Sequence, residues 1–197
     1  MFTKLGNSLS KLQKPDPRAA PTLGIEEEGF LLNKDGSRGY AWGKLYARLV
    51  KDLGDDAVGK EAREQIEVRT APHATVEALM ANVVTNRKRL LNHADALGFK
   101  LLMCGTLPNQ SIYSCGLHIH AGFGDDDERT QVMRKLRPLL PVFVLLGGSS
   151  AFKLGEMKGH AFRTNRLDCY IKNHELGTLE LRVTDSMPDV DDIAALA

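Results

Sequence analysis

The 197-residue sequence has few cysteines, few aromatic residues and no long apolar run. Three cysteines are too few, and odd in number, for a disulfide framework, so we expect reduced thiols. No window approaches the roughly 18 uninterrupted apolar residues of a membrane span, since even the run 139–146 contains Pro141. The amino-terminal segment also lacks the continuous apolar stretch of a secretory signal. These absences predict a soluble, cytoplasmic protein with no membrane partner.

Excess charge of either sign is absent as well. The chain has 26 Lys and Arg against 25 Asp and Glu, a net charge of +1. Nucleic-acid-binding domains usually carry a basic excess, so no nucleic-acid partner is expected. A hydrophobic fraction of 43% argues against disorder. We therefore expect one folded domain over residues 22–197, preceded by a flexible polar arm over residues 1–21, which contains three prolines.

Strand and helix patterns follow one another along this domain. Strands are predicted by apolar and β-branched runs at 22–33, 64–72, 99–104, 116–124 and 178–185. Helices are predicted by helical spacing at 44–53, 75–97, 125–146 and 189–197. The strand at 99–104 has the apolar composition of a buried strand. Pro138 and Pro141 should interrupt the third helix.

Four of the predicted strands carry charged or imidazole side chains at alternate positions. Because side chains alternate across a strand, the polar residues of each strand share one face and the apolar residues share the other. The polar pairs are Glu26 with Glu28, Glu67 with Arg69, His118 with His120, and Glu180 with Arg182. One such strand is usually only a half-solvated antiparallel strand. Four of them suggest a shared surface.

If the four strands belong to one sheet, the four glutamates Glu26, Glu28, Glu67 and Glu180 converge. Several carboxylates cannot stay ionised side by side without cations between them. Oxygen-rich sites suit Mg²⁺ or Mn²⁺, which often share their remaining positions with water and nucleotide phosphates. Arginines on the same faces can fork onto phosphate or carboxylate. The pattern therefore indicates nucleotide-dependent chemistry.

Four strings in this order resemble the carboxylate–amine ligases of the glutamate–cysteine ligase type 2 family and its short relatives. The strings are GIEEEGFLL (24–32), IEVRTAPHATVEAL (66–79), GLHIHAGF (116–123) and GTLELRVTDSMP (177–188). The resemblance extends from Thr22 to Ala197. It implies an α+β fold of the glutamine synthetase type: a curved, mainly antiparallel sheet of about five to six strands with helices packed on one face.

The resemblance also implies an activity and roles for individual residues. The activity is the ATP-dependent joining of a carboxylate, such as glutamate or another amino acid, to an amine through an acyl phosphate. ATP and Mg²⁺, or Mn²⁺, are the cofactors, the substrates are small molecules, and a homo-oligomer is compatible with the fold. The implied metal ligands are Glu26, Glu28, Glu67, His118 and Glu180. Two residues are implied to contact the reacting groups, Arg182 and Arg163. Three are implied to contact the nucleotide: Arg69, Arg166 and His120.

Two other functions and one other metal site stay open. A metal-dependent amide hydrolase would work without ATP, and a non-catalytic nucleotide- or metal-binding module would bind without turnover. Cys104, Cys115, His118 and His120 are residue types that bind zinc. Their C-x10-C-x2-H-x-H spacing matches no ordinary structural zinc site, so we favour the oxygen-rich site.

Overall fold

The structure is a computed structural model. It describes residues 20–40, 42–59, 64–107, 114–148, 152–153, 156–157, 171–173 and 177–197. The predicted polar arm lies almost wholly outside the described residues. In the described part, regular structure begins at Thr22, as predicted.

An antiparallel sheet forms the centre of the fold. Six strands pair in the order β2-β3-β1-β5-β9-β8, and a seventh, β4, also pairs with β1. The strands are β1 (Thr22–Leu32), β2 (Val58–Gly59), β3 (Gln65–Arg69), β4 (Lys100–Leu102), β5 (Gly116–Gly122), β8 (Ile171–Asn173) and β9 (Thr178–Asp185). A separate two-stranded pair consists of β6 (Phe152–Lys153) and β7 (Glu156–Met157). The long strand β1 is central, and its neighbours β3 and β5 come from distant parts of the sequence.

Side-chain caps and a proline account for several of the helix boundaries. They are α1 (Trp42–Leu53), the short 3-10 helix η2 (Asp55–Ala57), α2 (Val76–Ala96), α3 (Asp126–Leu136), the 3-10 turn η3 (Arg137–Leu139), α4 (Leu140–Leu146) and α5 (Val190–Leu196). Thr75 caps α2 by accepting a hydrogen bond from the Ala78 amide, and Asp125 caps α3 by accepting one from Glu128. Near Pro138 the third predicted helix breaks into α3, η3 and α4, as expected.

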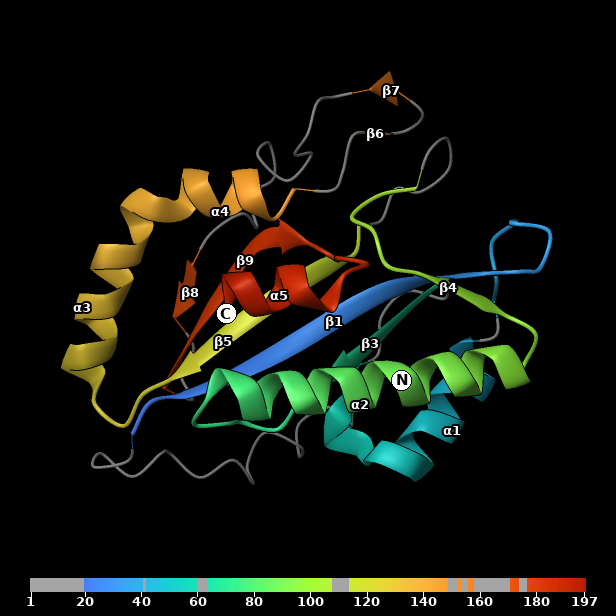
Figure 1. The fold of residues 1–197 in the computed structure, drawn as a ribbon, viewed down its shortest axis with the longest axis horizontal. Coiled ribbons are helices and arrows are strands. Elements are labelled where there is room, and N and C mark those ends of the chain that lie inside the picture. Colours follow the sequence, from blue (N-terminus) through green and yellow to red (C-terminus); the bar gives the residue numbers. More distant parts are fainter. Residues whose placement is uncertain are drawn as a thin grey trace, which may run out of the picture.

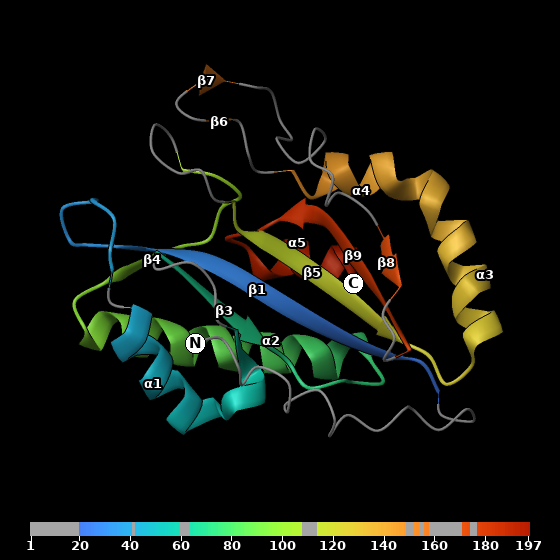
Figure 2. The same cartoon turned by 180° about the vertical axis from the view of Figure 1, so that it is seen from behind.

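Apolar side chains between the sheet and the helices form the core. Figure 1 shows α2 and α5 in front of the strands, and Figure 2 shows the other side, where β1 and β5 lie in front. Ile25 and Leu117 pack with residues of α2 and α5, and Ile66 and Val68 pack with residues of α1 and α2. Leu181 and its neighbours pack against α3 and α4. These residues occupy the strand positions predicted to be apolar.

The strand at 100–102 differs from its prediction. The expectation was a buried strand, but Lys100 and Leu102 are exposed. The reason is that β4 pairs only with the end of β1, at Phe30, Leu31 and Leu32, and stays three residues long. Across the described ranges, no helix combines the length and apolar content that crossing a bilayer would require.

Candidate metal and nucleotide site

The four polar pairs predicted from the sequence lie on one face of the sheet, opposite the face packed against helices. We call this the polar face: Glu67 and Arg69 on β3, Glu26 and Glu28 on β1, His118 and His120 on β5, and Glu180 and Arg182 on β9. The strand register brings them together, since Glu26 lies opposite both Arg69 and His118. Glu28 lies opposite Glu67, and His120 lies opposite Glu180. Residues more than 150 positions apart thus become neighbours.

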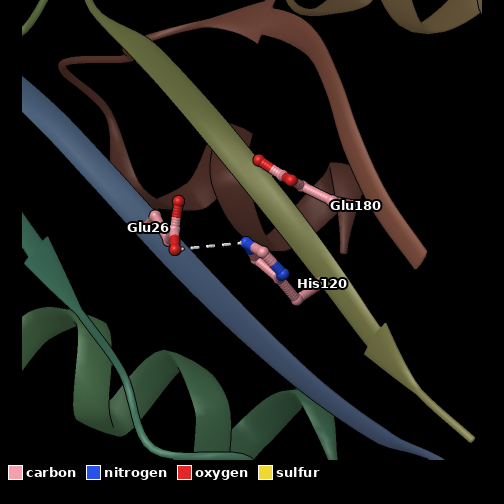
Figure 3. Close-up of side chains that lie close together, drawn as sticks. All are labelled: Glu26, His120 and Glu180. Atoms are coloured by element: carbon pink, nitrogen blue, oxygen red, sulfur yellow. Dashed lines mark ion pairs between the residues drawn. The ribbon is translucent and has the colours of Figure 1, made fainter. Parts of the chain in front are cut away.

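Three side chains of the polar face form a group that could hold a metal ion. One ligand atom from each of Glu26, His120 and Glu180 lies within 4.8 Å of the other two. Figure 3 shows the three side chains pointing toward one another from β1, β5 and β9, with the Glu26–His120 ion pair drawn. In the part of the chain that the structure describes, this is the one such group of three or more potential metal ligands. We call it the Glu26–His120–Glu180 group.

Glu26 is held in its charged form by its neighbours. Burial alone would raise the pKa of Glu26, but hydrogen bonds and charge from His118 and His120 outweigh it and hold the pKa well below its usual range. His118 Nδ1 lies 3.1 Å from Glu26 Oε2, and His120 Nε2 lies 3.4 Å from Glu26 Oε1. Glu26 is therefore an ionised carboxylate, as a metal ligand must be.

His118 lies close to three carboxylates of the polar face. Its side chain is almost fully buried, and Nδ1 lies 3.5 Å from Glu180 Oε1 as well as close to Glu26. On the other side, Nε2 lies 3.9 Å from Glu28 Oε1. The resemblance implied a metal role for His118 and a nucleotide role for His120, and the geometry places both imidazoles beside the carboxylates, with His118 Nδ1 3.1 Å and His120 Nε2 3.4 Å from the nearer Glu26 oxygen. Both roles remain predictions.

Two arginines neutralise part of the acidic charge. Arg69 Nη2 lies 2.5 Å from Glu67 Oε1, and its Nε lies 3.3 Å from Glu26 Oε1. Arg182 forms an ion pair with Glu180 and places Nη1 3.4 Å from His118 Nδ1. Both guanidiniums thus lie at the carboxylates themselves, where they could also meet phosphate.

Glu28 and Glu67 line the same face beside the Glu26–His120–Glu180 group. Glu28 Oε2 accepts a hydrogen bond of 2.7 Å from the Gly116 amide, which fixes the carboxylate. Glu67 packs against Gly59 of β2, where an added Cβ would lie 2.1 Å from Glu67 Oε1 and 2.8 Å from Glu67 Cβ. Sequence reasoning missed this use of Gly59, because only the pairing of β2 with β3 reveals it.

Glu27 lies between two polar-face glutamates but points to the helical side. There its carboxylate pairs with Arg87 of α2, which also donates to the backbone oxygens of Met187 and Pro188. Burial raises the pKa of Glu27, and the charge of Arg87 offsets only part of this. The sequence analysis did not identify this ion pair, since nothing local links α2 to β1.

Mg²⁺ or Mn²⁺ at the polar face is a better-supported metal site than zinc at the cysteines. Carboxylate oxygens are ligands that Mg²⁺ and Mn²⁺ favour, and an imidazole is compatible with Mn²⁺. Cys115 is buried and accepts a hydrogen bond from Gln65, while the Cys104 thiol donates to the Thr106 carbonyl. Burial, with help from the charge of Asp185, raises the pKa of Cys104 to about 11, which disfavours the thiolate that zinc needs.

Arg163 and Arg166, which the resemblance placed near phosphate, lie outside the described residues. Their roles remain predictions from the resemblance alone. The polar face therefore contains eight of the ten predicted site residues, and the Glu26–His120–Glu180 group contains three of these eight.

Sequence comparisons show that the chain resembles one enzyme family. The family model described as glutamate-cysteine ligase family 2 matches residues 22–114. A Bradyrhizobium diazoefficiens protein named "Putative glutamate--cysteine ligase 2" is 28% identical over 188 residues, covering 81% of this chain and 43% of the relative. A Streptomyces avermitilis relative of similar name is 29% identical over 160 residues, covering 68% and 44%. The chain thus spans less than half the length of these curated relatives.

Solved structures match the same arrangement of sheet and helices. Plasmodium falciparum glutamine synthetase matches with a TM-score of 0.59 and 11% identity, covering 90% of this chain and 50% of that one. The ligase PafA, solved in complex with the prokaryotic ubiquitin-like protein Pup, matches with a TM-score of 0.57 and 16% identity, covering 88% and 43%. The fold is therefore of the glutamine synthetase type, and the predicted sequence resemblance to glutamate–cysteine ligase family 2 is confirmed.

Proposed function

We propose that this chain carries the metal- and nucleotide-binding face of an ATP-dependent carboxylate–amine ligase. The observation that carries the proposal is the meeting of Glu26, His120 and Glu180 on the polar face of a glutamine synthetase-type sheet. The names of the relatives support ligation of a carboxylate to an amine. Because the chain covers under half of those relatives, the ligase activity and its substrates are proposals for this chain.

The reaction has two balanced steps. A substrate carboxylate oxygen attacks the γ-phosphorus of ATP, the bond to the β-phosphate oxygen breaks, and ADP leaves. The amine nitrogen then attacks the carbonyl carbon of the acyl phosphate, phosphate leaves with the C–O bond electrons, and the amine loses a proton. Bound Mg²⁺ supplies charge neutralisation on the phosphates, and positioning accounts for most of the remaining catalysis.

The chain's own residues fit these demands. Glu26, Glu180 and His120 would hold the metal, with Glu28, Glu67 and His118 supporting the same face. Arg182 and Arg69 would bind phosphate oxygens through their planar guanidiniums. The sheet fixes the backbone of these residues, because each comes from a strand paired on both sides. Preorganised charge of this kind needs no rearrangement at the moment of reaction.

The test is turnover of the full chain with ATP, Mg²⁺ and panels of amino acids and amines. We expect ADP release together with an amide product detected by mass spectrometry. Glu67→Gln and Glu180→Gln should each lower the rate about 100-fold or more, the scale for removing one preorganised electrostatic group. Glu77→Gln, an exposed carboxylate on α2, is the matched control and should leave the rate unchanged.

Other outcomes point to the other functions. Hydrolysis of an amide without ATP would support a metal-dependent hydrolase. Metal–nucleotide binding with no turnover for any substrate pair would leave a binding module. Normal turnover in Glu67→Gln or Glu180→Gln would contradict the assignment of the site.

A further inference from the structure

Arginines already form ion pairs with the carboxylates that would bind a metal. Arg182 is ion-paired to Glu180, and Arg69 reaches Glu26 at 3.3 Å and Glu67 at 2.5 Å. Glu26 and Glu180 are the two carboxylates of the Glu26–His120–Glu180 group. Each of these two carboxylates therefore has a guanidinium as a counter-ion.

A divalent cation in this group would meet two carboxylates and two competing positive charges. Of the two carboxylates, the Glu180 side chain is 2% exposed and that of Glu26 is 21% exposed, while Glu67, the other partner of Arg69, is 3% exposed. The side chains of Arg69 and Arg182 are 38% and 24% exposed, more than those of Glu67 and Glu180, with which they pair. In these two ion pairs the arginine is therefore the partner more accessible to an arriving ligand.

A triphosphate supplies what the displaced arginines need. A guanidinium displaced from its carboxylate without another anion would stay close to the arriving cation and repel it. Phosphate oxygens accept the same bidentate hydrogen bonds that the carboxylates accepted. A nucleotide that brings its own metal can therefore exchange partners at both arginines in one binding event.

We propose that Arg69 and Arg182 are resident counter-cations that compete with the metal until nucleotide phosphates take them over. This proposal rests on the proposed function, because it needs metal and nucleotide on the polar face. Its consequence is a coupling between the two ligands: bare Mn²⁺ binds weakly, and nucleotide strengthens its binding. Couplings between two ligands are typically about 5- to 150-fold in affinity.

The experiment measures Mn²⁺ affinity by calorimetry and by the paramagnetic resonance of free Mn²⁺, with and without a non-hydrolysable ATP analogue. Values are corrected for Mn²⁺ bound by the free analogue. In the unmodified chain, the analogue should tighten Mn²⁺ binding at least about 5-fold. Arg69→Gln and Arg182→Gln should each bind bare Mn²⁺ more tightly, by about 5- to 150-fold, yet bind the Mn²⁺–analogue complex more weakly.

Two further variants separate charge from shape and position. Arg89→Gln removes an exposed arginine that pairs with Asp52 on the helical side, so bare Mn²⁺ affinity should not change. Arg69→Lys retains the positive charge but loses the planar fork, so it should still disfavour bare Mn²⁺ while weakening the analogue complex. Far-ultraviolet circular dichroism and a melting curve verify that each variant is folded.

The outcomes test the partner exchange of the arginines separately from the proposed function on which it rests. If neither the unmodified chain nor any variant binds Mn²⁺ with or without the analogue, the proposed function is wrong. If Mn²⁺ binds, and Glu26→Gln weakens it, but Arg69→Gln and Arg182→Gln leave bare Mn²⁺ affinity unchanged or weaker, the partner exchange is wrong and the metal site stands. If Arg69→Gln and Arg182→Gln bind bare Mn²⁺ more tightly and the Mn²⁺–analogue complex more weakly, both the proposed function and the partner exchange are supported.

Discussion

Three consecutive glutamates in the middle of β1 show how one residue step changes a side chain's role. Glu26 and Glu28 face the polar side, where imidazoles and a backbone amide hold them. Glu27 faces the helices and pairs with Arg87. The same residue type is therefore a candidate ligand at two positions and a structural ion-pair partner at the third.

Glu27→Met should destabilise the fold without weakening metal binding. It leaves the buried Arg87 charge without its carboxylate, which typically costs about 3–5 kcal/mol. Urea unfolding of this variant measures the loss, with Glu77→Gln as an exposed control expected within about 0.5 kcal/mol of the unmodified chain. Glu26→Gln should show the reverse pattern, weaker Mn²⁺ affinity and little change in stability. Equal effects of both variants on Mn²⁺ affinity would contradict the separation of the two faces.

Gly59→Ala tests the support of Glu67 from β2. A Cβ at this position would lie 2.8 Å from Glu67 Cβ, so backbone or side chain must shift. We expect the Glu67 carboxylate to move and the affinity for the Mn²⁺–ATP analogue complex to fall about 10- to 100-fold, the range for lost support of a metal site. Gly43→Ala, where an added Cβ meets nothing within 4 Å, is the control. Undiminished affinity in Gly59→Ala would show that Glu67 does not need its present position.

At the scale of elements, the sequence predicted correctly those features that depend only on neighbouring residues. The strand at 178–185 and the start of a helix at Asp125 were predicted correctly, because alternation and helix starts depend on neighbouring residues only. The strands β2 and β8 were not predicted, since two or three residues are too few for a periodic pattern. The exposure of β4 could not be predicted because it depends on which strand lies beside it.

Asp125→Ala should weaken the start of α3. The Asp125 carboxylate accepts a hydrogen bond of 2.7 Å from the Glu128 amide, and its loss typically costs about 0.5–2 kcal/mol. The midpoint of urea unfolding should fall while Mn²⁺ affinity is unchanged, because α3 packs on the helical side. Asp127→Ala, an exposed neighbour, serves as the comparison. A loss of Mn²⁺ affinity in Asp125→Ala would show that α3 contributes to the site.

At the scale of the whole molecule, the central prediction was that the polar side chains of four strands converge on one surface. Alternation alone told which side chains share a face of each strand, and it was right for all four polar pairs. It could not tell which carboxylates each histidine contacts, because that depends on register and on the irregularity between Leu117 and Ile119 in the pairing of β5 with β9. Long-range pairing thus decides the details of the site, whereas the strand sequences decide its composition.

The most direct measurement is anomalous diffraction from a crystal of the full chain grown with Mn²⁺ and a non-hydrolysable ATP analogue. The account predicts an anomalous peak within coordination distance of Glu26, His120 and Glu180, with analogue phosphates next to it and the guanidiniums of Arg69 and Arg182 turned toward them. A polar face free of anomalous density while the analogue is bound elsewhere, or manganese bound only at the cysteines, would contradict it.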